Sequence, residues 1–359
     1  MPALAIEVLW HDGVIGGVAI RAELPAAGPL LVGQTPAAAL AILSRLYSIC
    51  GRAQRACAEL ALAAAGADVP LGPQRRAELA RAVTTEAVQE HLWRLLLDWP
   101  RQLGVAPRRQ DFARWYRRLG DPAAAAGGDA AARAPAGAPS WPAALLTEVE
   151  HEWLAAPLAV LPEWAALGRF DAWVARGATP LARLFAQLAA AARAARVPDA
   201  AGAAVAAAAM DAVGESGPLV RYAEHPWLAA LLADGRRLEA QLAARVVALA
   251  SLAAALAAGV AGCELDADSP APGRGIARLD TARGVLVHDV TLAAGRVAAY
   301  AIHTPTERHF AAGGPFSAAL DGRRAPDAAA AARLAELWAL AFDPCVSCSV
   351  SLAPEPGHA

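Results

Sequence analysis

The sequence contains no lysine and no asparagine, and aromatic residues make up only 6% of it. All 32 basic residues are arginines, and 34 acidic residues balance them to a net charge of −2. A nearly neutral chain creates no long-range field that would attract a nucleic acid or an acidic membrane. We therefore expect neither as a partner. The apolar content of 57% is inflated by alanine, which we attribute to a GC-rich genome.

A long hydrophobic run is also missing. The N-terminal MPALAIEVLWHDG has no basic segment followed by an apolar core and a cleavage site, so we expect no secretory signal. The longest charge-free stretch, residues 24–44, is broken by Pro25, Pro29 and Pro36 and cannot be one spanning helix. The longest such stretch without proline is Val246–Cys263, and eight of its eighteen residues are alanine. It only just reaches membrane-spanning length, and alanine contributes little to insertion. We expect a buried helix there, and a cytoplasmic protein.

Cysteine is too scarce for a disulfide framework, with five residues in 359. In the cytoplasm cysteines stay reduced and often serve metals or redox chemistry. The pair Cys345 and Cys348 is a Cys-x-x-Cys, whose thiols can reach one metal ion or each other. A second such pair is missing, because Cys50 and Cys57 are seven residues apart. Spacing alone therefore leaves three interpretations open: half a zinc site, a redox dithiol, or a chance occurrence.

The periodicity of apolar residues predicts a mainly helical α+β chain with small antiparallel β-sheets from both ends. Alternation about the turn at His11-Asp12-Gly13 predicts a strand pair over 4–23, and residues 283–304 predict another about Ala294-Gly295. Helical patterns cover residues 35–49, 50–65, 74–97 (ending at Trp99-Pro100), 147–156, 179–195, 228–258 and 327–342.

The sequence indicates one domain over residues 1–359. Within it, the segment 121–142 consists mostly of alanine, glycine and proline. Such a segment cannot bury enough apolar surface to fold by itself, so we expect a flexible insertion there.

Four segments, in one order along the chain, resemble signatures of the nickel–iron hydrogenase large subunit. The family's C-terminal Asp-Pro-Cys-x-x-Cys-x-x-His is similar to residues 343–351 (DPCVSCSVS), and its Arg-x-Cys-Gly-x-Cys-x-x-x-His to residues 45–54 (RLYSICGRAQ). Its Ala-Pro-Arg-Gly-x-Leu-x-His is similar to residues 281–288 (TARGVLVH), and its Val-Pro-Thr-Thr-Trp-Asn-Phe to residues 304–310 (TPTERHF). The resemblance spans nearly the whole chain and implies the fold of that family.

The departures from these signatures concern nickel. In the family, the first cysteine of each pair is a terminal nickel ligand and the second bridges nickel to iron. This chain keeps both bridging positions, Cys50 and Cys348, and one terminal position, Cys345, but has Tyr47 at the other. Ser351 replaces the final histidine, and the N-terminal proton-handling glutamate has no counterpart. A phenol does not replace a soft thiolate on nickel, so we expect no nickel and no hydrogenase activity.

The resemblance therefore implies that the residues around iron are kept and that the set of nickel ligands is incomplete. It implies an Fe(CN)₂CO unit held by Cys50 and Cys348, with Cys345 assisting ligand exchange. Arg283 stands at the family's cyanide-contacting arginine, and Thr306, after Pro305, at its hydroxyl donor. Cyanide ligands on iron accept hydrogen bonds and need buried donors.

This pattern resembles the HupK/HoxV hydrogenase accessory proteins, relatives thought to act as scaffolds in cofactor assembly. The implied partners are the apo large subunit of a hydrogenase and iron carriers of the HypC/HypD type. A metal-free chaperone of the maturation machinery, a divergent catalytic subunit and a dithiol oxidoreductase remain as alternatives.

Several residues also have purely structural interpretations. Arg283 could be an ion-paired structural arginine, and Thr306 an ordinary turn hydroxyl. We expect Cys57 and Cys263 to be structural, and His288 to be a hydrogen-bonded core histidine rather than a metal ligand.

Overall fold

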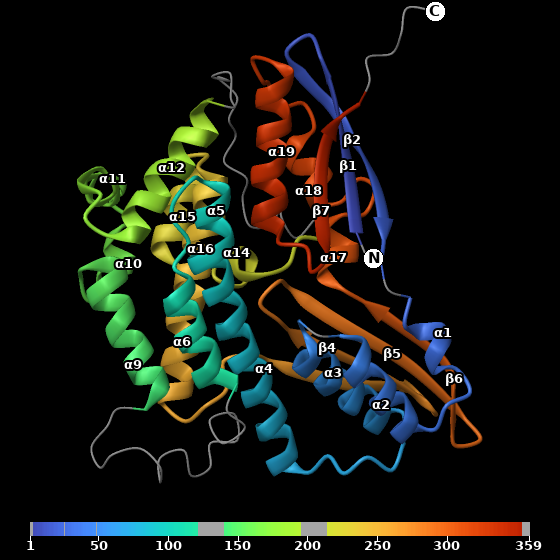
Figure 1. Ribbon diagram of the computed structural model, residues 1–359. Coiled ribbons are helices and arrows are strands. Elements are labelled where there is room, and N and C mark those ends of the chain that lie inside the picture. The colour runs from blue at the N-terminus through green and yellow to red at the C-terminus, as the bar shows by residue number, and fades with distance from the viewer. Residues whose placement is uncertain (1–2, 25, 48, 121–139, 195–213, 354–359) are drawn as a thin grey trace, which may run out of the picture.

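The computed structural model describes residues 3–24, 26–47, 49–120, 140–194 and 214–353. Figure 1 shows three groups of elements: a helical body, a three-stranded sheet with its helices, and a four-stranded sheet with its helices. The α+β class expected from the sequence is confirmed. The expected flexible insertion lies largely outside the described residues, except that Trp141 and Pro142 already belong to a helix.

The helical body surrounds one long buried helix, α16 (Arg237–Ala257), on which α4 (Pro73–Trp93) and α9 (Trp141–Glu148) pack. α16 is long and apolar enough to cross a membrane, but 72% of its apolar window is buried inside the protein. The expectation of a buried helix is thus confirmed. The other elements of the body are η1 (Arg94–Asp98), α5 (Trp99–Gln102), α6 (Arg109–Gly120), η2 (Val149–Leu154), α10 (Val160–Glu163), α11 (Leu167–Arg176), α12 (Pro180–Ala194), α14 (Pro218–Arg221) and α15 (Pro226–Ala233).

Two helix boundaries differ from expectation. The predicted helix 228–258 is divided into α15 and α16, because Gly235 adopts a φ of 71° in the turn between them. The predicted helix 74–97 does not end at Trp99-Pro100. It continues through the π-helical turn η1 into α5. Pro100 has no N–H to donate there, and the Leu96 carbonyl four residues earlier accepts instead from the Arg108 N–H at 2.8 Å.

The three-stranded sheet has the order β2-β1-β7 and joins the two ends of the chain. β1 (Ala3–His11) pairs antiparallel with β2 (Val14–Glu23), as predicted, and turns Leu4, Ile6 and Val8 into the core. β7 (Ser347–Leu352) pairs with β1 in parallel, with Leu4 opposite Cys348. The expectation that all sheets are antiparallel is therefore wrong for this strand. α18 (Pro315–Leu320) and α19 (Ala328–Phe342) pack beside this sheet.

The four-stranded sheet is antiparallel in the order β3-β4-β5-β6, with bounds Leu265–Ala271, Arg274–Asp280, Val285–Ala293 and Arg296–His303. β5 and β6 are the predicted second strand pair. The helix α3 (Gly51–Ala64) packs against β4 and β5, and α2 (Pro36–Leu46) packs against α3. The side chain of Thr35 caps α2 by accepting from the Ala38 N–H, as expected. The short helices α1 (Gly28–Leu31) and α17 (Pro305–His309) complete the described elements.

Candidate functional site

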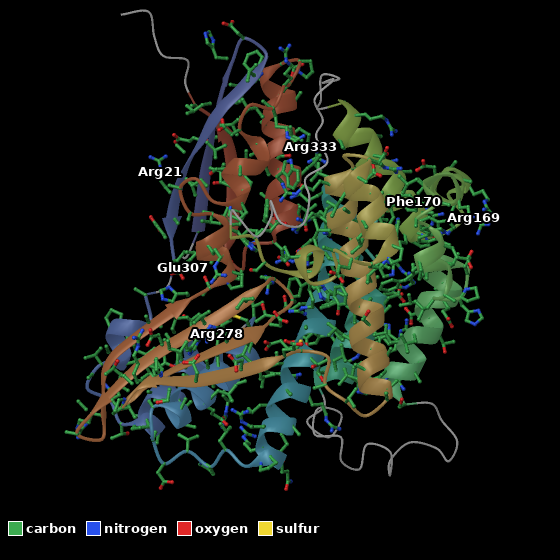
Figure 2. All side chains as sticks on the ribbon, turned by 180° about the vertical axis from the view of Figure 1, so that it is seen from behind. Arg21, Arg169, Phe170, Arg278, Glu307 and Arg333 are labelled. Carbon is green, nitrogen blue, oxygen red and sulfur yellow. The ribbon has the colours of Figure 1, made fainter. Side chains whose placement is uncertain are left out.

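The site lies where the two sheets and the helical body meet. Cys50 is the N-cap of α3, and Cys345 follows the C-terminal end of α19. Arg283 belongs to the turn between β4 and β5, and Thr306 to the first turn of α17. Figure 1 shows α17 at the junction of the two sheets, and Figure 2 shows its Glu307 there from the opposite side. Segments 300 residues apart in the sequence are thereby brought together.

Thr306 is fixed beside Cys345. Thr304 caps α17 through a capping box with Glu307, and Pro305 takes the first helical position, so the orientation of Thr306 is set by the helix start. The Thr306 hydroxyl donates to Cys345 Sγ at 3.3 Å and accepts from the Cys345 N–H at 3.2 Å. Thr306 is 1% exposed. It is therefore more than a turn hydroxyl, since it binds both the thiol and the backbone N–H of Cys345.

Cys50 lies within electrostatic reach of Cys345 and Arg283. Burial raises the pKa of the Cys50 thiol to about 12, and the charges of Cys345 and Glu86 add to the increase, whereas Arg283 opposes it. Burial also raises the pKa of Tyr47 to about 12, with further contributions from Cys50, Glu307 and Cys345. Tyr47, Cys50, Cys345, Arg283 and Thr306 therefore form one group, and a cation bound there would favour the thiolates.

The guanidinium of Arg283 is buried between two carboxylates. Its Nη2 donates to Glu90 Oε2 at 2.6 Å, and its Nε donates to the Asp343 carbonyl at 3.1 Å and lies 3.3 Å from Asp343 Oδ1. Burial alone lowers the pKa of Arg283, but the charges of Asp343 and Glu90 raise it above its ordinary value. Arg283 is thus both an ion-paired arginine and a permanent cation beside two thiols.

Asp343 anchors the segment that carries Cys345. It ends α19 with a left-handed φ of 55° and is 1% exposed. Its carboxylate forms ion pairs with Arg94, Arg245 (Oδ2 to Nη1, 3.1 Å) and Arg283. Burial by itself raises the pKa of Asp343, but the charges of the three arginines outweigh this effect. The pKa of Asp343 is therefore below its ordinary value. The charged anchor fixes the start of the Asp-Pro-Cys turn.

Two functional candidates on α4 did not emerge from the sequence. Glu90 pairs with Arg283, and Glu86 accepts hydrogen bonds from the backbone N–H groups of Arg52 and Ala53 at 2.8 and 3.0 Å. Glu86 thereby caps the helix that Cys50 begins. Burial raises its pKa to about 7. The available signal was two glutamates four residues apart on a helix face that is otherwise apolar, which places both on one buried side.

Cys348 is placed differently from Cys345. It is exposed on β7 and lines a hollow of about 450 Å³ with Arg94, Asp98, Arg101 and Glu336 among others. Partial desolvation raises its pKa to about 11. The charge of Cys345 contributes to the raised pKa of Cys50. The structure thus brings together Cys50 and Cys345, while ligation by Cys50 and Cys348 stays a prediction.

The remaining cysteines and His288 are buried in the core. Cys57 donates weakly to the carbonyls of Ala277 and Leu286, and Cys263 is 5% exposed. Both ring nitrogens of His288 have hydrogen-bond partners, as expected for a core histidine. Within the described parts of the chain, no three His, Cys, Asp or Glu side chains are arranged to hold a metal ion.

Comparison with known proteins adds family and fold. No family model matches the sequence. The chain is 30% identical to the hydrogenase expression/formation protein HupK of Rhizobium leguminosarum bv. viciae, over 97% of this chain and 96% of the relative. It is also 30% identical to the hydrogenase expression/formation protein HoxV of Cupriavidus necator, over 99% of this chain and 97% of the relative.

Among solved structures, the fold is similar to the nickel–iron–selenium hydrogenase of D. vulgaris Hildenborough in its reduced state. The TM-score is 0.55 at 15% identity, and the match covers 95% of each chain. The fold is thus that of the nickel–iron hydrogenase large subunit. With the near-complete coverage of its relatives, the chain belongs to the family of hydrogenase expression/formation proteins that includes HupK, HupV and HoxV.

Proposed function

We propose that this protein is an accessory scaffold in hydrogenase maturation, which holds an Fe(CN)₂CO unit as cargo and passes it to the apo large subunit. Membership in a family of hydrogenase expression/formation proteins supports a role in maturation. The observation that carries the finer proposal is a group of two half-buried thiols, Cys50 and Cys345, with the buried cation of Arg283 and the buried hydroxyl of Thr306.

The chemistry of this group suits iron with cyanide and carbonyl ligands. Thiolates are soft ligands that suit iron, and cyanide nitrogens need hydrogen-bond donors in a site that excludes water. Arg283 would donate to one cyanide. The Thr306 hydroxyl, held after Pro305, would turn from Cys345 Sγ, to which it donates in the iron-free protein, and donate to the other cyanide. Tyr47 takes the place of a thiolate and reduces the number of soft ligands below that of a nickel site. We infer that the protein does not turn over hydrogen.

We propose Cys50 and Cys348 as the iron ligands, with Cys345 assisting exchange. Cys345 is held by the Thr306 hydroxyl, whereas Cys348 is exposed on β7. A site with three thiols and no nickel should hold its cargo less firmly than the four-thiolate site of the enzyme, which favours release. A cysteine of the acceptor would attack the iron as its thiolate while one scaffold sulfur leaves and takes up a proton. Iron carriers of the HypC/HypD type would supply the cargo.

Single cysteine variants test the proposal in cells that depend on this protein for hydrogenase maturation. Cys50→Ser and Cys348→Ser should abolish or strongly reduce the formation of mature large subunit, and Cys345→Ser should slow it. The matched control is Cys263→Ser, because Cys263 is buried away from the group. If all four variants mature hydrogenase at the rate of the unmodified protein, the cysteines are dispensable and the metal-free chaperone is the correct interpretation.

A further inference from the structure

A continuous series of hydrogen bonds starts at the sulfur of Cys50 and runs into the four-stranded sheet. Gln54, one helical turn after Cys50 on α3, donates from its Nε2 to Cys50 Sγ at 3.9 Å. Its Oε1 lies 2.9 Å from Nε2 of His288 on β5. The other ring nitrogen of His288, Nδ1, lies 2.8 Å from the hydroxyl of Tyr300 on β6. Three elements thus contribute one residue each.

The series is enclosed. Gln54 is 1% exposed, His288 0% and Tyr300 8%, so water does not compete for their polar atoms. The titratable groups near it are few: Cys57 and Tyr47 contribute to the environment of Tyr300, and His303 to that of His288. The Cys57 thiol donates to backbone carbonyls and is therefore not a member of this series of hydrogen bonds.

The direction of donation follows from the inventory of donors. Burial lowers the pKa of His288 to about 3, with a smaller contribution from His303, so the imidazole is neutral and has one N–H. An amide oxygen only accepts, which requires that this N–H is on Nε2, facing Gln54. Nδ1 therefore accepts from the Tyr300 hydroxyl. Each donor in the series therefore points toward Cys50. Because the amide oxygen of Gln54 accepts from His288, its N–H₂ group faces the sulfur of Cys50.

We propose that Gln54 supplies the N–H donor to the Cys50 sulfur, and that His288 and Tyr300 are positioning residues that fix the orientation of its amide. The effect of this hydrogen bond on a bound iron rests on the proposed function. An N–H···S bond withdraws electron density from a thiolate, so Cys50 donates less to a bound metal and is displaced more readily. This is the behaviour that a hand-over site requires. Gln54 stands where the large-subunit signature has histidine, so the amide donor is a feature of this chain.

The iron-loaded protein gives the first test. In the protein purified anaerobically from cells with the full maturation set, Gln54→Met should shift the infrared CO band to lower wavenumber, since a more donating sulfur increases back-donation to CO. Gln54→His, which retains an N–H donor, should leave the band near its original position. His288→Leu should shift the band as Gln54→Met does. A CO band at an unchanged position in both Gln54→Met and His288→Leu would overturn the proposal.

The iron-free protein gives a second test that does not depend on the proposed function. Nitrogen-15 NMR of histidine-labelled protein should show His288 as the neutral tautomer with the proton on Nε2, and Tyr300→Phe should reduce this preference. A proton on Nδ1 in the unmodified protein would contradict the direction of donation. If no iron bands appear even in the unmodified protein, the proposed function fails, and this spectrum alone decides the inference. Circular dichroism establishes that each variant is folded.

Discussion

At the scale of single residues, the site contains a network of buried ion pairs around Arg283. Arg283, Arg245 and Arg94 are each paired, and the carboxylates of Glu90, Asp343 and Asp98 neutralise them. Buried ion pairs are weak net contributors to stability, but removing one partner leaves the other charge uncompensated. The network therefore constrains which substitutions this site tolerates.

Replacement of Arg283 should be among the most destabilising changes in the site. Arg283→Ala leaves Glu90 and Asp343 buried without this partner, so the free energy of unfolding should fall by about 3–5 kcal/mol. The control is Arg278→Ala, whose side chain is 44% exposed on β4 and pairs with Asp268 at 2.8 Å. Figure 2 shows Arg278 on the four-stranded sheet. Its loss should cost less than about 1 kcal/mol. Urea unfolding of both variants measures the difference, and equal losses would contradict the described network.

Glu86 should make stability depend on pH in a defined window. Burial raises its pKa from 4.5 to about 7, so the folded protein binds more protons than the unfolded chain between these values. The stability that neutral Glu86 contributes is complete below pH 4.5 and is lost as the pH rises through 7. In Glu86→Gln this dependence disappears. The stability of the variant relative to the unmodified protein should increase between pH 4.5 and 7 by on the order of 3 kcal/mol.

Urea titrations at several pH values measure this change, and comparing the two proteins at each pH cancels the titration of all other groups. A relative stability that is constant across the window, or that falls with rising pH, would show that Glu86 is ionised in the folded protein.

Sequence patterns located some site residues and not others. Thr306 and Cys345 were found because they lie in short contiguous signatures, and the structure joins them by two hydrogen bonds. Glu86 and Glu90 were missed, because a glutamate in a helix is ordinarily exposed and only their four-residue spacing on an otherwise apolar face marks their burial. The different surroundings of Cys345, held by Thr306, and of Cys348, exposed on β7, were not predictable either, because β7 pairs with a strand at the other end of the chain.

At the scale of elements, close packing of β4 on α3 depends on Gly275. A Cβ atom at this position would lie 2.0 Å from the carbonyl oxygen of Ala61 and 2.4 Å from the N of Ala65. Both atoms belong to the backbone and cannot move aside cheaply. The glycine therefore allows the sheet to approach the helix that Cys50 begins, which explains Gly275 as a packing feature.

Gly275→Ala should accordingly separate β4 from α3. We expect the free energy of unfolding to fall by about 1–3 kcal/mol, the usual cost of overpacking. Gly168→Ala is the matched control, because Gly168 lies in helix α11 with open space at its Cβ position and should gain about 0.5–1 kcal/mol. Thermal unfolding of the two variants checks the prediction. A neutral Gly275→Ala would mean that β4 does not approach α3 this closely.

Some strands could be predicted from their sequences and others could not. β5 and β6 alternate clearly about Ala294-Gly295 and were predicted. β3 was not, because residues such as Asp266, Asp268 and Ser269 give an exposed edge strand no apolar face. β7 is short and mostly exposed, and its register is set by β1 rather than by its own residues.

At the scale of the whole molecule, the fold of a hydrogenase large subunit is retained around a site with altered ligands. The helical body contributes Glu86 and Glu90, the four-stranded sheet and α3 contribute Arg283 and Cys50, and the C-terminal segment contributes Cys345. Figure 1 shows these three parts meeting at one place. The charged network and the glycine contact described above both serve to hold them in that arrangement.

Infrared spectroscopy of the protein, purified without oxygen from cells that express the complete maturation set, tests the central claim most directly. We predict bands from iron-bound CO and cyanide, and their loss in Cys50→Ser and in Cys348→Ser. The Cys263→Ser variant should retain them. The absence of these bands from the unmodified protein, together with normal hydrogenase maturation in the cysteine variants, would contradict the scaffold and assign the protein to maturation through contacts alone.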